Sequence, residues 1–119
     1  MQNEIPLVQK LYDFYKLFYE MIDHFPKKSR PVLGQKIESV ILEVLELVSL
    51  AAYSGNTEKN KALMKASLKV DFLKILIRLA YETQTIDQKK YILLEEKLQE
   101  IGKMLGGWLK SLKSTNPDI

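Results

Sequence analysis

The sequence contains no cysteine and a single histidine among its 119 residues. Without cysteine the chain forms no disulfide bond and offers no thiolate to a metal. One histidine falls short of the nitrogen ligands that a zinc site uses, so we expect no metal site and no metal cofactor. The lack of cysteine agrees with the reducing conditions of the cytoplasm, where we expect the protein to reside.

Long apolar runs are also missing. The longest uninterrupted runs are only a few residues, whereas roughly 18–20 are needed to span a bilayer. The first six residues contain no basic region followed by an apolar run, so they lack the pattern of a signal peptide. We therefore expect no membrane partner.

Patterns of catalytic residues are absent as well. No glycine-rich phosphate loop follows a predicted strand, because no strand is predicted. His24 stands alone at the end of the first predicted helix, where a histidine usually lies at the surface and suits the helix dipole. No histidine follows Glu95, Glu96 or Glu100 at i+3, as the Glu-x-x-His pattern of a di-iron bundle requires. No candidate base is found in the sequence for Ser29, Ser39 or Ser67. We expect no catalytic residue, no cofactor and no enzymatic activity.

What the sequence does contain is a helical repeat. With 46% hydrophobic and 28% charged residues, the chain has the composition of one folded domain, which we place at residues 1–119. Apolar residues recur at spacings of three and four, and short polar turns separate the repeats. This pattern predicts an all-α protein, an up-down-up-down antiparallel four-helix bundle. Its helices are expected at about 7–25, 30–54, 57–83 and 86–112, followed by a polar tail at 113–119.

Turn-forming residues lie between the predicted helices. Ser29 is expected to cap the start of the second helix with its side chain. Gly55 is expected to end that helix in the left-handed conformation, with Asn56 or Thr57 capping the third. The segment Thr85–Gln88 has the spacing of a capping box and is expected to begin the fourth.

The third predicted helix differs from its neighbours because it has two apolar sides. The second, by contrast, has one apolar face and a solvated acidic back, on which we expect no site. One side of the third helix contains Ala62, Ala66, Val70, Leu73, Ile77 and Ala80. A helix with a second apolar side must be buried in its own domain or against another subunit. We therefore predict a homo-oligomer whose interface contains Met64, Leu68, Phe72, Ile75 and Leu79.

Positive charges gather in two parts of the sequence. The net charge is +3, a weak indication of a polyanionic partner that strengthens if several subunits pool their charge. Lys27, Lys28 and Arg30 precede a predicted helix, where cations oppose the helix dipole, so we interpret them as a phosphate-binding turn. A solvated basic turn is the alternative interpretation. The third helix adds candidates for nucleic-acid binding along its edges: Lys65, Lys69, Lys74 and Arg78.

Three glycines interrupt the fourth predicted helix: Gly102, Gly106 and Gly107. Each weakens a helix interior by ~1 kcal/mol relative to alanine, so we interpret them as positions where another backbone or ring packs closely. The segment Glu100–Leu109 around them has the form Ile-Gly-basic-x-Leu-Gly-x-Trp. Together with Phe25–Lys28 and Leu73–Ala80, it resembles the accessory variability determinant (Avd) proteins of diversity-generating retroelements. These belong with the proteins encoded in bacterial 23S rRNA intervening sequences.

The resemblance implies a four-helix bundle that assembles into a positively charged, pentameric barrel. Such a barrel binds the reverse transcriptase of the retroelement and RNA or DNA. It supports the mutagenic copying of a template RNA into cDNA without catalysing any step. Nucleic-acid binding carries over to Lys27, Lys28, Arg78 and Lys103, which lie in the matching segments.

Two other functions stay open. A purely structural or protein-binding bundle, such as an rRNA intervening-sequence protein, would dock a partner helix on the exposed apolar stripe and use its lysines only for solubility. A nuclease that uses the carboxylates of the fourth helix is the third candidate. Metal-dependent cleavage by the pure protein would be needed to support it.

Overall fold

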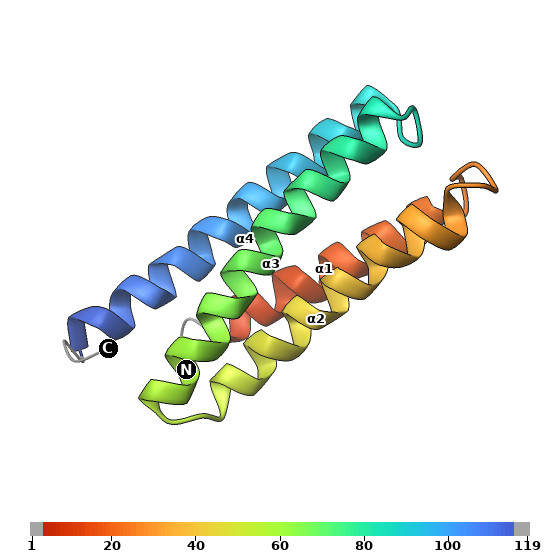
Figure 1. Cartoon of the computed structure of the whole chain (residues 1–119). Coiled ribbons are helices and arrows are strands. Elements are labelled where there is room, and N and C mark those ends of the chain that lie inside the picture. The colour runs from red at the N-terminus through yellow and green to blue at the C-terminus, as the bar shows by residue number, and fades with distance from the viewer. Residues whose placement is uncertain (1–3, 116–119) are drawn as a thin grey trace.

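The computed structural model describes residues 4–115 and contains four α-helices, which are labelled in Figure 1. They are α1 (Glu4–Ile22), α2 (Gln35–Ala52), α3 (Asn56–Glu82) and α4 (Gln88–Thr115), and a short π-helical turn, η1 (Arg30–Gly34), precedes α2. Figure 1 shows successive helices running in opposite directions along a body of 47 × 21 × 20 Å. The predicted all-α bundle of four helices is confirmed.

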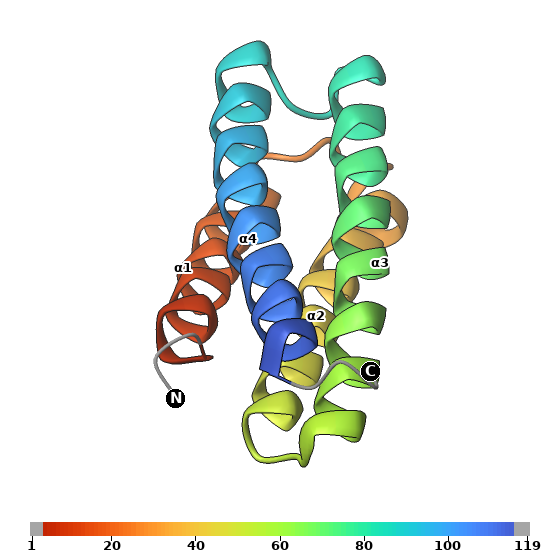
Figure 2. The same cartoon turned by 90° about the vertical axis from the view of Figure 1, so that its left-hand side faces the viewer.

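The four helices pack around a square. In chain order each contacts the next, and α1 completes the square against α4. Figure 2 shows this arrangement, with α4 lying between α1 and α3 in the view and α2 behind them. Every helix therefore has an inner face in the core and an outer face that points away from the square.

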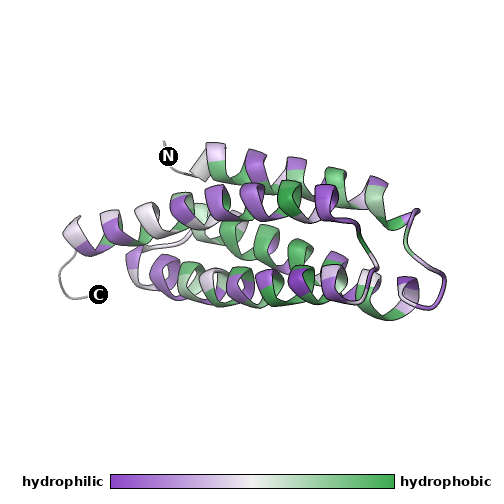
Figure 3. Ribbon diagram, turned by 90° about the horizontal axis from the view of Figure 1, so that it is seen from above, coloured by the Kyte–Doolittle hydropathy of each residue, from purple (hydrophilic) through white to green (hydrophobic). Residues whose placement is uncertain are grey.

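Apolar side chains at the predicted spacings fill the space between the helices. Figure 3 shows green and purple alternating along each helix, as amphipathic helices require. The apolar line of α1 is buried throughout and continues to Phe25 just beyond the helix: Leu7, Leu11, Phe14, Phe18, Met21 and Phe25. On α4 the buried line includes Leu94, Leu98, Ile101, Leu105, Trp108 and Leu112. Trp108, 4% exposed, is a core residue.

The connection between α1 and α2 differs from the prediction. α1 ends at Ile22 rather than Phe25, and the amides of His24 and Phe25 bond to carbonyls three residues earlier. Ser29 makes no side-chain capping bond, so the predicted cap is wrong. Its backbone already has helical angles (φ −86°, ψ −25°), whereas a capping residue needs an extended backbone. The amide of Gly34 instead bonds to the Ser29 carbonyl at 2.9 Å, which produces the π-helical turn.

The turn between α2 and α3 also differs. Gly55 has an extended backbone (φ −70°, ψ 167°), so the predicted left-handed conformation is wrong. Gly55 is itself the residue before the first turn of α3, and α3 begins at Asn56, so neither Asn56 nor Thr57 is the cap. Glycine has no side chain that could accept a hydrogen bond, so the first backbone amides of α3 have no side-chain cap from Gly55.

The start of α4 is capped two residues later than predicted. Oδ1 of Asp87 accepts the amide of Lys90 at 2.9 Å, which is the bond of an N-cap. Thr85, the predicted cap, is buried at 6% exposure and its hydroxyl bonds to Ser29 of the other connection at 3.3 Å. The two connections therefore meet at one end of the bundle. The connection between α3 and α4 contains Gln84, the one non-glycine among the described residues with a positive φ (61°).

The end of α4 lies beyond the predicted position at 112. The helix continues to Thr115, and the hydroxyls of Ser114 and Thr115 bond to carbonyls one turn earlier. The predicted polar tail is thus helical over 113–115. The rest of that predicted tail, residues 116–119, lies outside the described residues.

Candidate functional site

Helix α3 has an apolar flank that the other described helices leave uncovered. The exposed fractions of its five side chains run from 40% for Phe72 to 69% for Leu68, and the set is Met64, Leu68, Phe72, Ile75 and Leu79. The opposite side is buried, as predicted: Ala62, Ala66, Val70, Leu73, Ile77 and Ala80. About half of five large side chains amounts to roughly 500 Å², the size of patch that marks an interaction site. We call these five residues the α3 flank.

Along the edge of α3 nearest α2, two of the predicted cations have different surroundings. Lys65 is exposed. The ammonium of Lys69 pairs with the carboxylate of Glu43 on α2 at 2.5 Å, and this hydrogen bond lowers the pKa of Glu43 below 4.5. Further along the same edge, the Lys36 ammonium of α2 lies 5.9 Å from the ring centre of Phe72. Along this edge, charged side chains of α2 and α3 therefore lie directly beside the apolar flank.

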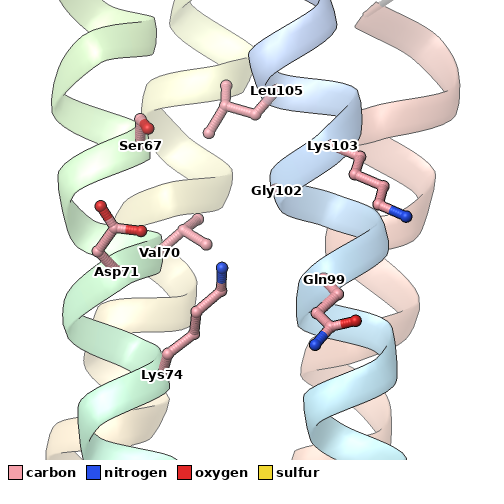
Figure 4. Close-up of a pocket in the computed structure, with 8 residues that line it drawn as sticks. All are labelled: Ser67, Val70, Asp71, Lys74, Gln99, Gly102, Lys103 and Leu105. Atoms are coloured by element: carbon pink, nitrogen blue, oxygen red, sulfur yellow. The ribbon is translucent and has the colours of Figure 1, made fainter.

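Along the other edge, a hollow of about 280 Å³ lies between α3 and α4 (Figure 4). Lys74 extends from α3 into this hollow, and its ammonium lies 3.6 Å from the point where a Cβ on Gly102 would stand. Other polar groups line the hollow: Ser67, Asp71, Gln99 and Lys103. In Figure 4 the Lys103 side chain points away from Lys74, so only one of the two ammonium groups faces inward.

The other two glycines of α4 do not behave as expected within one chain. A Cβ on Gly106 or Gly107 would meet no atom within 4 Å, so no backbone or ring of the described residues packs on them. The predicted close packing is therefore wrong inside the described chain for both residues. At Gly102 the neighbour is the Lys74 ammonium rather than a backbone or ring.

At the end of the bundle where the two connections meet, Lys27 and Lys28 are exposed. Arg30 is also exposed, but its guanidinium donates hydrogen bonds to the carbonyls of Asp23 at 3.1 Å and Phe25 at 3.2 Å. Arg30 therefore satisfies carbonyls just beyond the end of α1, a structural role at the helix that precedes it, while phosphate binding by the three cations stays a prediction. For the two lysines, no hydrogen bond or ion pair is found among the described residues 4–115.

The structure adds two cations to this end that sequence reasoning missed. Lys89 and Lys90 lie in the first turn of α4, next to the connection that bonds to Ser29. Cations at a helix start oppose the dipole, which is the same signal that selected Lys27 and Lys28. Cations at a predicted helix start are therefore visible in the sequence at the fourth helix too, as Lys89 and Lys90.

The eight predicted nucleic-acid residues do not form one patch. Lys74 and Lys103 line the same hollow, whereas Lys65 and Lys69 lie on the opposite edge of α3. Arg78 is exposed and pairs with Glu82 one turn along α3, at 3.0 Å. The roles of all eight in nucleic-acid binding, and of the α3 flank in oligomer formation, stay predictions.

Two further features bear on other kinds of site. Within residues 4–115, no group of three or more His, Cys, Asp or Glu side chains is arranged to hold a metal ion. None of the described helices combines the length and the apolar character needed to cross a membrane.

A comparison with protein families finds a match to the model of the bAvd-like family, bacterial Avd-like proteins, over residues 5–112. The matched region includes the three segments that resemble Avd proteins in sequence, so that resemblance is confirmed. No curated protein and no solved structure matches the chain.

Proposed function

The chain belongs to the bAvd-like family, and from this premise we propose that it is a non-catalytic accessory protein of a diversity-generating retroelement. In this role it assembles into a homopentameric ring that binds a reverse transcriptase together with RNA or DNA. The ring supports mutagenic cDNA synthesis by holding the nucleic acid near the polymerase. Family membership supports the accessory role, and the surfaces of α3 support assembly and binding.

The α3 flank is the observation that carries the oligomeric part of the proposal. A monomer would leave this patch in water, at a cost of about 25 cal/mol for each Å². Assembly removes that cost and brings several basic subunits together. Because each subunit has a net charge of +3, the field at the surface of a ring grows with the number of subunits.

The nucleic-acid part follows from electrostatics rather than from base recognition. Exposed lysines bind phosphates without regard to sequence, and each neutralised phosphate releases counterions. Affinity for RNA or an RNA–DNA duplex is therefore expected to fall at least tenfold between about 50 and about 200 mM salt. Affinity that barely changes over this range would exclude an electrostatic binding mode.

A pair of double variants tests the basic turn. Lys27→Gln/Lys28→Gln removes two exposed cations that pair with none of the residues the structure describes, and it is expected to weaken RNA binding several-fold. Lys110→Gln/Lys113→Gln makes the same change in net charge near the end of α4, outside the candidate site, and is expected to weaken binding much less. Equal losses in the two variants would remove this turn from the binding surface. Circular dichroism checks that both remain helical.

One observation favours the second candidate, a structural or protein-binding bundle without affinity for nucleic acid. Three of the eight predicted cations already have partners in the protomer: Arg30, Lys69 and Arg78. In that case the α3 flank would dock a helix of another protein. A chain that stays monomeric in sedimentation and binds no RNA at low salt would support this second function over the first.

A further inference from the structure

The hollow between α3 and α4 contains an acid that phosphate binding alone does not explain. Asp71 lines it together with Lys74, one turn further along α3, and Ser67, one turn earlier. Spacings of four and three residues place these side chains on one side of the helix, as Figure 4 shows. A carboxylate repels phosphate, so an acid next to the ammonium that would bind one weakens the binding of a bare polyanion.

The two charges in the hollow are not neutralised by the helices around them. Three other cations of α3 are paired: Lys61 with Glu58, Lys69 with Glu43 and Arg78 with Glu82. An acid and a lysine three residues further along a helix often pair in the same way. Within residues 4–115, however, Lys74 and Asp71 form no ion pair or hydrogen bond with each other or with a third residue. Both groups are therefore available to a ligand that offers a negative charge to the ammonium and a hydrogen-bond donor to the carboxylate.

The hollow has the size of a single sugar. Its volume of about 280 Å³ equals that of roughly nine water molecules at ~30 Å³ each. Val70 and Leu105 line it and are almost fully buried, so they provide an apolar base. Gly102 leaves the α4 side open because it has no side chain. A sugar ring can therefore lie on the apolar base with its hydroxyls and its phosphate directed at the polar groups of α3.

We infer that the hollow holds one ribose of a bound RNA strand, with Lys74 on the adjoining phosphate and Asp71 on the 2′-hydroxyl. The hydroxyl donates a hydrogen bond to the carboxylate, and the Ser67 hydroxyl is a second partner for it. DNA lacks the 2′-hydroxyl, so Asp71 contributes only repulsion to a DNA strand. The inference rests on the proposed nucleic-acid binding and names the strand that is preferred.

Such a contact selects the sugar without selecting the base. The polar groups of the hollow meet the backbone of the strand, which is the same for every nucleotide, so the preference for RNA is independent of its sequence. In the proposed role, this preference would retain the template RNA rather than its cDNA copy.

Three single strands of the same base sequence and length measure the preference. They are RNA, DNA, and RNA with fluorine in place of each 2′-hydroxyl, which keeps the RNA-like sugar conformation but has no proton to donate. At one salt concentration, the wild type is expected to bind the RNA roughly three- to tenfold more tightly than either of the other strands, the gain from one added hydrogen bond.

Two alanine variants separate the contact from the charge. Asp71→Ala removes the acceptor and is expected to bind the three strands alike, with a higher affinity for DNA than the wild type has. Glu20→Ala is the matched control, because it makes the same change in net charge at an exposed position of α1, diagonally opposite α3. It is expected to keep the preference of the wild type for RNA.

Other outcomes overturn the inference in distinguishable ways. If the wild type binds RNA and DNA equally, or if Asp71→Ala keeps the preference for RNA, the inference is wrong while the proposed nucleic-acid binding stands. Loss of the preference in both alanine variants would also overturn it, since net charge alone would then explain the effect. If the wild type binds none of the strands at low salt, the proposed function fails as well. Asp71 and Glu20 are exposed, and circular dichroism confirms that both variants are folded.

Discussion

The ammonium of Lys74 lies over the backbone of Gly102, 3.6 Å from the point where a Cβ would stand. The glycine keeps the hollow between α3 and α4 open, and the lysine places a positive charge inside it (Figure 4). An alanine at this position would make ordinary van der Waals contact with the lysine, whereas a larger side chain would occupy the hollow. The small size of Gly102 on α4 therefore leaves room for the positive charge that Lys74 brings from α3.

Replacement of this glycine separates its effect on helix stability from its effect on the hollow. Gly102→Ala is expected to raise the free energy of unfolding by about 0.5–1 kcal/mol, because glycine weakens a helix interior. Gly102→Leu is expected to displace Lys74 and weaken RNA binding. Gly106→Leu is the matched control, since it points into open space. Equal RNA affinity in the two leucine variants would show that the hollow is not used.

The α3 flank and the core side of α3 are expected to respond oppositely to substitution. Leu73→Ala removes a fully buried side chain and is expected to cost about 2–5 kcal/mol in thermal or denaturant unfolding. Leu68→Gln/Ile75→Gln replaces exposed side chains and is expected to leave the stability of the protomer nearly unchanged while dissociating the oligomer. A large loss of protomer stability in the second variant would contradict an exposed flank.

The Lys69–Glu43 pair predicts a pH-dependent contribution to stability. Because the pKa of Glu43 is lowered in the folded state, the pair stabilises the fold above the unfolded value, near 4.5, and this contribution is lost as pH falls through the lower folded value. Both side chains are more than a third exposed, so solvent screening limits the effect to about 0.5 kcal/mol. Lys69→Met is expected to lower stability by that amount near neutral pH and by less in acid. A constant difference from neutral pH down to acid would contradict the ion pair.

The two helix-end contacts are expected to contribute separately. Asp87→Ala removes the cap of α4 and is expected to cost about 1 kcal/mol. Arg30→Gln removes two hydrogen bonds to carbonyls beyond α1 and is expected to cost a similar amount. Lys27→Gln, in the same connection, serves as the control and is expected to cost little. The stabilities of the variants are compared by their denaturant midpoints. Equal midpoints for Arg30→Gln and Lys27→Gln would argue against a stabilising role of the Arg30 hydrogen bonds at the end of α1.

The helices and the two sides of α3 could be predicted because they depend on residue spacing alone. Leu73 and Leu68 fall on opposite sides at 100° per residue, and the structure buries the first and exposes the second. The caps could not be chosen in the same way, since Thr85 and Asp87 both suit an N-cap and only the contact of Thr85 with Ser29 separates them. The partner of Lys69 was also out of reach, because it depends on how α2 is aligned against α3.

The central claim is that assembly through the α3 flank creates the nucleic-acid-binding form of the protein. RNA affinity at low salt, compared between the wild type and the neutral variant Leu68→Gln/Ile75→Gln, tests it most directly, because the two chains have the same net charge. The account predicts that the variant is monomeric and binds RNA at least tenfold more weakly. A monomeric variant that binds RNA as tightly as the wild type would contradict it.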